Sequence, residues 1–162
     1  MKPVELHVYD FDGALYDSPR LHVDRPDWWY SAKSLQGWGA PGHDPKWILG
    51  TVMEARRSVR TPWVRTALLT GRPLHGEMLS TLKKMLRAAH LPFNEVQLKP
   101  LLPPTDTPAY KAIRVVDWLS EHPTIHKVVF YDDLPENLAA MGHALSYYQD
   151  VEYVPVLTPG VS

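Results

Sequence analysis

Apolar residues in this chain fall into two alternating patterns. Short apolar runs that fit buried strands occupy residues 5–9, 63–72, 94–99, 127–131 and 152–156. Between them, apolar residues recur at the spacing of a helix face, which predicts helices over residues 46–59, 74–90, 109–121 and 136–145. Strands that alternate with helices predict an α/β fold with a parallel sheet and right-handed crossovers. The run at 94–99 is the predicted edge strand.

The spacing also identifies the inward face of each of the first three helices. These faces are formed by Trp47, Ile48, Val52 and Ala55, by Met78, Leu82, Met85, Leu86 and Ala89, and by Ile113, Val116, Trp118 and Leu119. Thr107 and Pro108 are the predicted N-cap and first residue of the third helix. Lys111 in its first turn is unusual, because the helix dipole disfavours a cation there. Lys111 is therefore either solvated or placed against an anion.

Residues 17–61 interrupt this periodicity. The segment is rich in proline and glycine and contains four of the six tryptophans of the chain. We therefore expect a single domain over residues 1–162 with a small insertion, a cap, at about 17–61. The tryptophans either form the core of this insertion or stack on a nucleobase, where stacking contributes about 1 to 3 kcal/mol per base. They are Trp28, Trp29, Trp38 and Trp47.

The composition narrows the class of protein. The 17 Lys and Arg residues nearly balance the 18 Asp and Glu residues, so no overall charge attracts nucleic acid or anionic lipid. Cysteine is absent, which excludes disulfides, thiolate zinc sites and cysteine nucleophiles. No apolar run is long enough to span a bilayer, and no signal sequence precedes the first strand. We expect a soluble, cytoplasmic protein with no membrane partner.

Two carboxylates follow the first predicted strand at the spacing of two residues. Asp10 and Asp12 would lie on one face of a regular strand, where like charges resist joint ionisation unless a cation lies between them. Gly13 permits the sharp change of backbone direction that frees the second carboxylate from the sheet. The alternative is a strand that ends in a solvated acidic turn.

Polar residues also lie at the ends of two further predicted strands. Thr70, Gly71 and Arg72 end the second strand, and the pair Asp132 and Asp133 follows the fourth. Ligands bind at the carboxyl ends of strands in α/β sheets, so these groups are expected at one edge together with the first two carboxylates. With Lys111, they form a pattern that suits phosphoryl transfer: carboxylates for a metal and for attack on phosphorus, and cationic and hydroxyl groups for phosphoryl oxygens.

The order of these motifs resembles that of the haloacid dehalogenase (HAD) superfamily of phosphohydrolases. The matching residues are Asp10-Phe11-Asp12-Gly13-Ala14, Leu68-Leu69-Thr70-Gly71-Arg72, Lys111 and Tyr131-Asp132-Asp133. A closer resemblance is to the HAD domain of Swiss Army Knife RNA repair proteins, through Ser18-Pro19, Trp28-Trp29, Leu69-Thr70-Gly71-Arg72, Thr107-x-x-Tyr110-Lys111 and Tyr131-Asp132-Asp133. The resemblance implies a Rossmann-like three-layer sandwich with a central parallel sheet.

The resemblance also implies roles for individual residues. Asp10 would be the nucleophile that forms an aspartyl-phosphate, and Asp12 would protonate the leaving oxygen and then activate water. Mg²⁺ would be held by Asp10, by the backbone carbonyl of Asp12 and by Asp132, with Asp133 as the rival ligand. The phosphoryl oxygens would be bound by Thr70, Gly71 and Lys111.

Two positions depart from the family pattern. Ala14 stands where threonine or valine is usual, and the smaller side chain is expected to loosen the loop and lower activity. Asn137 stands where some relatives have a second acid, which leaves the charge to Asp132 and Asp133.

Two other features have open interpretations. Arg72 either contacts substrate, as Trp28 and Trp29 would, or braces the loop. The basic run of the helix over 46–59 and the strand that follows either tracks a phosphate backbone or is a solvated helix face; it comprises Arg56, Arg57, Arg60 and Arg65.

Three functional hypotheses follow from the sequence. The first is a Mg²⁺-dependent phosphohydrolase whose phosphorylated substrate is a nucleic-acid or nucleotide end. The second is a binding module that keeps the phosphate pocket but has low activity, as an adaptor in a nucleic-acid repair system; Ala14 favours it. The third is a small-metabolite phosphatase. The absence of a GxxxxGK motif argues against an ATP-dependent kinase.

Overall fold

The computed structural model of the chain describes residues 1–19 and 26–162. Within these residues the strands are Glu5–Tyr9 (β1), Val64–Pro73 (β2), Glu95–Lys99 (β3), Lys127–Asp132 (β4) and Glu152–Leu157 (β5). The helices are Pro26–Trp29 (α1), Leu49–Val59 (α2), Met78–Ala88 (α3), Thr107–Glu121 (α4) and Pro135–Leu145 (α5), with a short 3₁₀ helix at Ala32–Leu35 (η1). Part of the predicted insertion, residues 20–25, lies outside the described residues.

The strands form one parallel sheet in the order β3-β2-β1-β4-β5. This confirms the predicted α/β fold and the edge position of β3. The chain order reverses between β1 and β4, and Tyr9 of β1 pairs in register with Leu68 and Tyr131 of its two neighbours. In open α/β sheets, ligands bind beyond the carboxyl ends of the strands at such a reversal.

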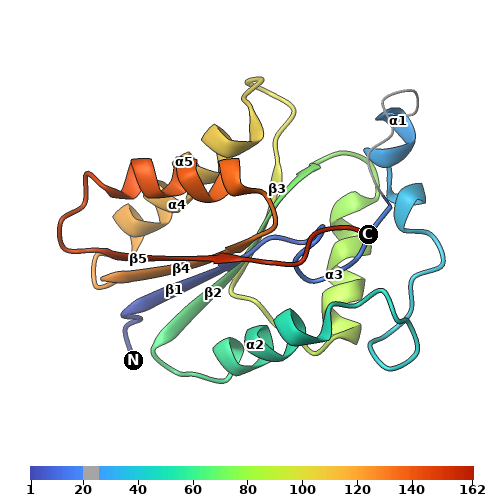
Figure 1. Cartoon of the computed structure of the whole chain (residues 1–162), viewed down its shortest axis with the longest axis horizontal. Helices are drawn as coiled ribbons and strands as arrows, with labels where there is room; N and C mark the ends of the chain where they lie inside the picture. The colour runs from blue at the N-terminus through green and yellow to red at the C-terminus, as the bar shows by residue number, and fades with distance from the viewer. Residues whose placement is uncertain (20–25) are drawn as a thin grey trace.

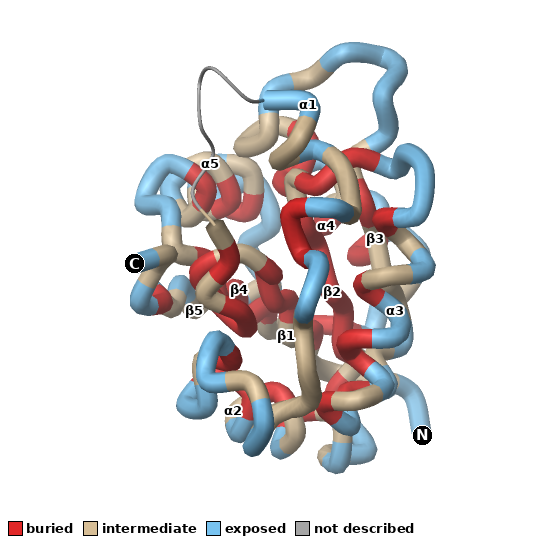
Figure 2. The backbone as a smooth tube through the Cα atoms, turned by 90° about the vertical axis from the view of Figure 1, so that its right-hand side faces the viewer, coloured by how far each residue is buried: buried red, intermediate tan, exposed pale blue. Residues whose placement is uncertain are grey.

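Helices cover both faces of the sheet, which gives three layers (Figure 1). On one face, α2 and α3 pack on Tyr9 and Leu68; on the other, α4 and α5 pack on Leu6 and Val8. Successive residues of β1 point to opposite faces, so this single strand serves both cores. Figure 2 shows the buried residues concentrated along β1, β2 and β4.

The buried faces of α2 and α3 agree with the sequence pattern, although both helices are shorter than predicted. The first begins at Leu49 rather than residue 46, and the second at Met78 rather than residue 74. Trp47 is buried ahead of α2, where it packs edge-on to Tyr16, and Trp38 packs against the same core. Trp47 is therefore a core residue, and Trp38 is half-buried against that core. The division of residues 17–61 into a separate cap stays a prediction.

Two predictions for α4 were wrong. Its N-cap is Asp106, whose carboxylate accepts a hydrogen bond from the Ala109 backbone N–H at 2.9 Å, and not Thr107. Ile113 is 57 % exposed instead of inward, because the buried face runs through Lys111. Residues two apart on a helix point to nearly opposite sides, so burial of Lys111 turns Ile113 outward. The buried positions of α4 include Val115, Trp118 and Leu119.

No helix among the described residues is long and apolar enough to cross a membrane.

His7 gives the fold a testable pH dependence. Its ring lies 2.7 Å from the Ser58 hydroxyl and 3.1 Å from the Glu5 carboxylate, and burial lowers the pKa of His7 below its ordinary value of 6.5, which the Glu5 contact only partly offsets. The unfolded chain therefore binds a proton at His7 more readily than the folded protein does as the pH falls through 6.5.

We expect the free energy of unfolding, measured in urea, to fall between pH 7.5 and pH 5.5, and His7→Gln to make this fall smaller. The exposed His43, changed to Gln, is the matched control. Equal declines in wild type and His7→Gln would contradict the prediction.

Candidate active site

The predicted acidic residues meet at the carboxyl ends of β1 and β4. Asp10 directly follows β1, and Asp132 is the last residue of β4. The Asp10 N–H donates to the Tyr131 carbonyl at 2.9 Å, which continues the pairing of the two strands by one step. Side chains from the beginning and the end of the chain are thereby brought together.

Lys111 lies between these two carboxylates. Its Nζ atom donates to Asp10 Oδ1 at 2.9 Å and to Asp132 Oδ2 at 2.6 Å, and the residue is 1 % exposed. Burial alone lowers the pKa of a lysine, but the two carboxylates together raise the pKa of Lys111 above its ordinary value. Because α4 begins at Thr107, Lys111 is its fifth residue, just beyond the first turn, and it faces anions rather than solvent.

Three carboxylates in this region are close enough to share one cation. Oxygen atoms of Asp10, Asp132 and Asp133 lie within 4.8 Å of one another. Burial raises the pKa of Asp10 well above its ordinary value, more than Lys111 lowers it, and burial likewise raises the pKa of Asp133. Their ionised forms therefore need positive charge beyond Lys111. The donor set of three carboxylates fits Mg²⁺, which prefers oxygen ligands.

Asn137 lies beside the three carboxylates and adds an amide oxygen, a further ligand atom of the kind that Mg²⁺ prefers. Its Nδ2 atom donates to both Asp132 oxygens, at 3.1 and 3.2 Å, and the Leu134 N–H donates to Asp132 Oδ1 at 2.9 Å. The Asn137 Oδ1 atom is buried and has no hydrogen-bond partner in the part of the chain that the structure describes. A neutral amide at this position orients Asp132 and leaves one oxygen acceptor free beside the carboxylate cluster.

The loop after β1 is closed by a glycine and by the C-terminal residues. Gly13 has φ +75°, and a Cβ atom there would overlap the Asp133 carboxylate. The Gly13 carbonyl accepts hydrogen bonds from Thr158 Oγ1 and from the Gly160 N–H, both at 2.9 Å. Ala14 is fully buried, and its N–H donates to the Phe11 carbonyl at 3.3 Å. The loop is thus tied down at a position with a small side chain.

Asp12 is paired with Arg72 rather than with the carboxylate cluster. Arg72 is fully buried and donates to Asp12 through Nε, at 3.0 and 3.1 Å, and through Nη2, at 2.8 Å. Its Nη1 atom donates to the Trp29 carbonyl at 2.9 Å and to Ser34 Oγ at 2.6 Å. Asp12 Oδ1 also accepts a hydrogen bond from Ser18 Oγ at 2.5 Å. These contacts favour the bracing interpretation of Arg72 over substrate contact.

Arg72 holds Asp12 through a geometry that lysine cannot reproduce. Lysine lacks the planar fork that bonds Asp12 and the residue 29–34 segment at the same time. We expect Arg72→Lys to lower the free energy of unfolding by about 2 to 4 kcal/mol, since several buried hydrogen bonds are lost. The measurement is urea unfolding followed by tryptophan fluorescence. The exposed Arg87, changed to Lys, is the control; a loss in Arg72→Lys no larger than in that control would contradict the bracing role.

Thr70 and Gly71 lie beside this network at the end of β2. The Thr70 hydroxyl oxygen accepts from the Arg72 N–H at 3.1 Å, which leaves the hydroxyl proton free to be donated. Gly71 lines the cleft, and a Cβ atom there would lie 3.0 Å from Thr107 Cγ2. Their predicted phosphate-binding role stays a prediction.

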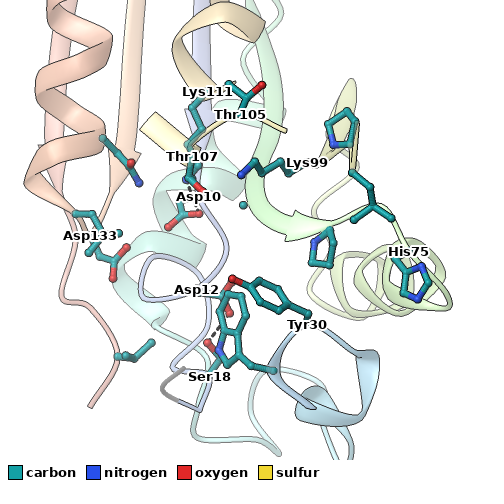
Figure 3. Close-up of a pocket in the computed structure, with 18 of the residues that line it drawn as sticks. Asp10, Asp12, Ser18, Tyr30, His75, Lys99, Thr105, Thr107, Lys111 and Asp133 are labelled. Atoms are coloured by element: carbon teal, nitrogen blue, oxygen red, sulfur yellow. Dashed lines mark hydrogen bonds and ion pairs between the residues drawn. The ribbon is translucent and has the colours of Figure 1, made fainter. Parts of the chain in front are cut away.

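A cleft of about 690 Å³ opens onto the acidic residues (Figure 3). Asp10, Asp12, Lys111 and Asp133 line it, whereas Asp132 is fully buried behind them. Residues of the predicted insertion, 17–61, form one part of the cleft wall. Among the described residues of this segment, Trp29 lines the cleft and Trp28 does not. The other lining residues from the segment are Ser18, Pro19 and Tyr30.

Lys99 is a cleft residue that the sequence reasoning missed. It is the last residue of β3, and Figure 3 shows its side chain pointing from the strand end toward Asp10 and Thr107. No ion pair joins it to a carboxylate of the described residues. The sequence could have identified Lys99, because it is a charged residue at the carboxyl end of a predicted parallel strand. The acids at the ends of β1 and β4 were identified by the same rule.

Comparison with protein families identifies a matching family. A family described as HAD domain family 1 in Swiss Army Knife RNA repair proteins matches residues 14–156. The matched segment includes Thr70, Lys111, Asp132 and Asp133 and begins just after Asp10 and Asp12. No curated protein sequence matches the chain significantly.

Solved structures share the fold at low sequence identity. The HAD domain of the effector protein Lem4 from Legionella pneumophila, an inactive mutant, has a TM-score of 0.60 and 13 % identity, with 99 % of this chain and 88 % of that chain covered. A chain in the structure of a Pnkp1/Rnl/Hen1 complex has a TM-score of 0.58 and 11 % identity, with 97 % of this chain covered. This chain spans 48 % of that one. The likeness establishes an HAD-like fold.

Proposed function

This chain belongs to the family of HAD domains found in Swiss Army Knife RNA repair proteins, and we propose that it is a Mg²⁺-dependent phosphohydrolase for phosphorylated nucleic-acid or nucleotide ends. The observation that carries the proposal is the position of Asp10. Its carboxylate faces the cleft, is 2.9 Å from the Lys111 ammonium and lies within 4.8 Å of two further carboxylates. A nucleophile beside a cation and a metal-ligand set suits attack on phosphorus.

The proposed reaction has two steps, and Asp10 and Asp12 divide the work. An Asp10 oxygen attacks phosphorus, the bond from phosphorus to the ester oxygen breaks, and Asp12 gives its proton to that leaving oxygen. Water then attacks the aspartyl-phosphate and loses a proton to Asp12, which releases phosphate and restores both residues. Arg72 and Ser18 keep the Asp12 carboxylate in one orientation through both steps.

The equatorial phosphoryl oxygens gain most from fixed positive charge and hydrogen-bond donors. Lys111, the Thr70 hydroxyl and the Gly71 backbone are the groups proposed for this role. Mg²⁺ would be held by Asp10, Asp132 or Asp133 and the backbone carbonyl of Asp12, and when bound it supplies charge neutralisation for the phosphoryl group.

The cleft wall supports a substrate that carries an aromatic base. Trp29 and Tyr30 offer ring surface, and Tyr30 is 42 % exposed. Lys99 adds a cation on the same cleft. Rings next to cations suit nucleotides, because bases stack on aromatic side chains and phosphates bind cations.

A phosphatase panel with and without Mg²⁺ tests the proposal. The substrates are p-nitrophenyl phosphate, a 5′-mononucleotide, a sugar phosphate, and oligonucleotides with a 3′ or a 5′ terminal phosphate, with phosphate release as the readout. We expect Mg²⁺-dependent hydrolysis that is fastest for an end-phosphorylated oligonucleotide or a nucleotide. Preference for the sugar phosphate would overturn the substrate class, and no hydrolysis of any substrate would overturn the enzymatic function.

Lys99 is expected to bind the substrate rather than stabilise the fold. Lys99→Gln removes a cation that has no acidic partner among the described residues, so it should raise KM about tenfold, with kcat changed less than threefold, and leave the unfolding midpoint unchanged. Steady-state kinetics on the best substrate of the panel provide the measurement. Lys2→Gln, at the far end of β1, is the control; equal KM values for wild type and Lys99→Gln would refute the assignment.

A further inference from the structure

A second concave surface lies between α2 and α3, outside the catalytic cleft. It has a volume of about 670 Å³ and shares no described lining residue with the cleft. The C-terminal halves of the two helices form its walls, and the segment that joins α3 to β3 forms its floor. Figure 1 shows α2 along the bottom of the molecule and α3 upright to its right. We refer to this surface as the α2–α3 groove.

Basic side chains line both walls of the α2–α3 groove. Arg56 and Arg60 come from α2 and its C-cap, Lys83 and Arg87 from α3, and His90 from the turn that follows. None of the described lining residues is acidic. This local charge contrasts with the net charge of −1 of the whole chain. The groove is therefore a strongly positive region on a nearly neutral protein.

Contacts between the walls fix the shape of the groove. Arg56 Nε donates to the Ala89 carbonyl at 2.9 Å, which joins α2 to the end of α3. Arg60 Nε donates to the Arg56 carbonyl at 3.1 Å. Both arginines are thus held at Nε, and Arg56 Nη1 also donates to Met53 Sδ at 3.8 Å. Apolar side chains lie between the walls: Val59, Leu86, Leu91, Pro92, Phe93 and Val96.

The hydrogen-bonding character of the groove discriminates between classes of polyanion. Its charged side chains only donate, and its described lining contains no Asp, Glu, Asn, Gln, Ser or Thr side chain that could accept. A peptide brings backbone N–H donors that would find no side-chain partner among these residues, apart from a ring nitrogen of His90. Phosphate oxygens only accept, and bases present flat apolar faces to the floor.

We propose that the α2–α3 groove binds the backbone of single-stranded nucleic acid. Arg56 and Arg60, and likewise Lys83 and Arg87, are four residues apart, so each pair is separated by about 6 Å along its helix. The two pairs thus provide successive cations on opposite walls for consecutive phosphates. Arginine dominates the set, and its planar fork matches phosphate oxygens. This site is separate from the catalytic one and does not depend on the proposed phosphatase activity.

Neighbouring basic residues outside the groove provide a matched control. The test variant is Arg60→Gln with Lys83→Gln, and the control is Arg57→Gln with Lys84→Gln. Both remove the same charge from the same two helices, but Arg57 and Lys84 are exposed and do not line the groove. Fluorescence anisotropy of a labelled oligouridylate, titrated at several salt concentrations, measures binding. Circular dichroism establishes that both variants fold, and hydrolysis of p-nitrophenyl phosphate establishes an unchanged catalytic site.

The expected result is a dissociation constant raised on the order of tenfold in the test variant, with the control close to wild type. The slope of log affinity against log salt should become shallower by about 0.7 for each lost phosphate contact. Asp10→Asn should bind as wild type does, which separates this site from catalysis. Equal losses in the test and control variants, or tighter binding of poly-glutamate or of phosphatidylserine vesicles than of the oligonucleotide, would overturn the proposal.

Discussion

Asp10→Asn is expected to reduce phosphate hydrolysis on the order of 10⁴-fold while the protein stays folded. The amide is nearly the size of the carboxylate but is a far weaker nucleophile toward phosphorus. Asparagine also removes one of three crowded carboxylates, and Lys111 keeps Asp132 as a partner at 2.6 Å. The metal-free melting temperature should therefore not fall. Initial rates with p-nitrophenyl phosphate and Mg²⁺, together with thermal melts, provide the measurement.

The exposed Asp150, changed to Asn, is the control for the general effect of removing an acid. A rate for Asp10→Asn within tenfold of wild type would exclude Asp10 as the nucleophile. A large loss of both activity and melting temperature would instead show that Asp10 acts mainly in folding, which contradicts the expected separation.

Lys111→Met is expected to lower the free energy of unfolding by about 3 to 5 kcal/mol, because it leaves two buried carboxylates without their shared cation. Methionine keeps most of the length and apolar stem of lysine, so the loss reports on charge more than on packing. Activity should also be lost, since Lys111 is the proposed phosphoryl ligand. Urea unfolding without divalent cations measures the stability, and repetition with excess Mg²⁺ should restore part of it.

The double variant Asp10→Asn with Lys111→Met tests the origin of this loss. With one carboxylate already neutral, removing Lys111 costs less, so the double variant should be less destabilised than the sum of its single variants. Additive effects, or a loss below about 1 kcal/mol in Lys111→Met, would show that the lysine and the carboxylates are not energetically coupled.

The site could be predicted largely because its residues follow one rule. The carboxyl ends of parallel strands lie at one edge, so acids after β1 and β4 were expected at the same edge once the alternation of strands and helices was recognised. That β1 and β4 are adjacent came from the structure. For Lys111, predicted in the first turn of a helix, the sequence left two possibilities, solvation or contact with an anion. The structure supplies two anions, Asp10 and Asp132.

Other features depend on contacts that sequence patterns do not encode. Arg72 bonds Asp12 from 60 positions away, and nothing local distinguishes that arrangement from an arginine aimed at substrate. The inward face of α4 includes a buried lysine, so a pattern of apolar residues placed Ile113 inside by mistake. Asp106 and Thr107 are both good N-caps, and Pro108 is tolerated at either of the first two helical positions, so the sequence leaves the choice open.

The effect of the small side chain of Ala14 stays a prediction. We expected this residue to loosen the loop after β1. The structure ties the loop by backbone hydrogen bonds around Phe11 and by bonds from Thr158 and Gly160 to the Gly13 carbonyl. Its order thus depends on residues about 145 positions later as well as on the side chain at position 14.

The bonds from Thr158 and Gly160 to Gly13 decide where an affinity tag or fluorescent fusion can be attached. Val161 lines the cleft, and Ser162 donates its backbone N–H to Asp17 at 2.7 Å, so bulk added after Ser162 would lie beside the cleft and the loop that follows Asp10. Met1 is 92 % exposed and lies at the opposite end of the strands (Figure 1). Recombinant protein for every assay described above is best purified through its amino end.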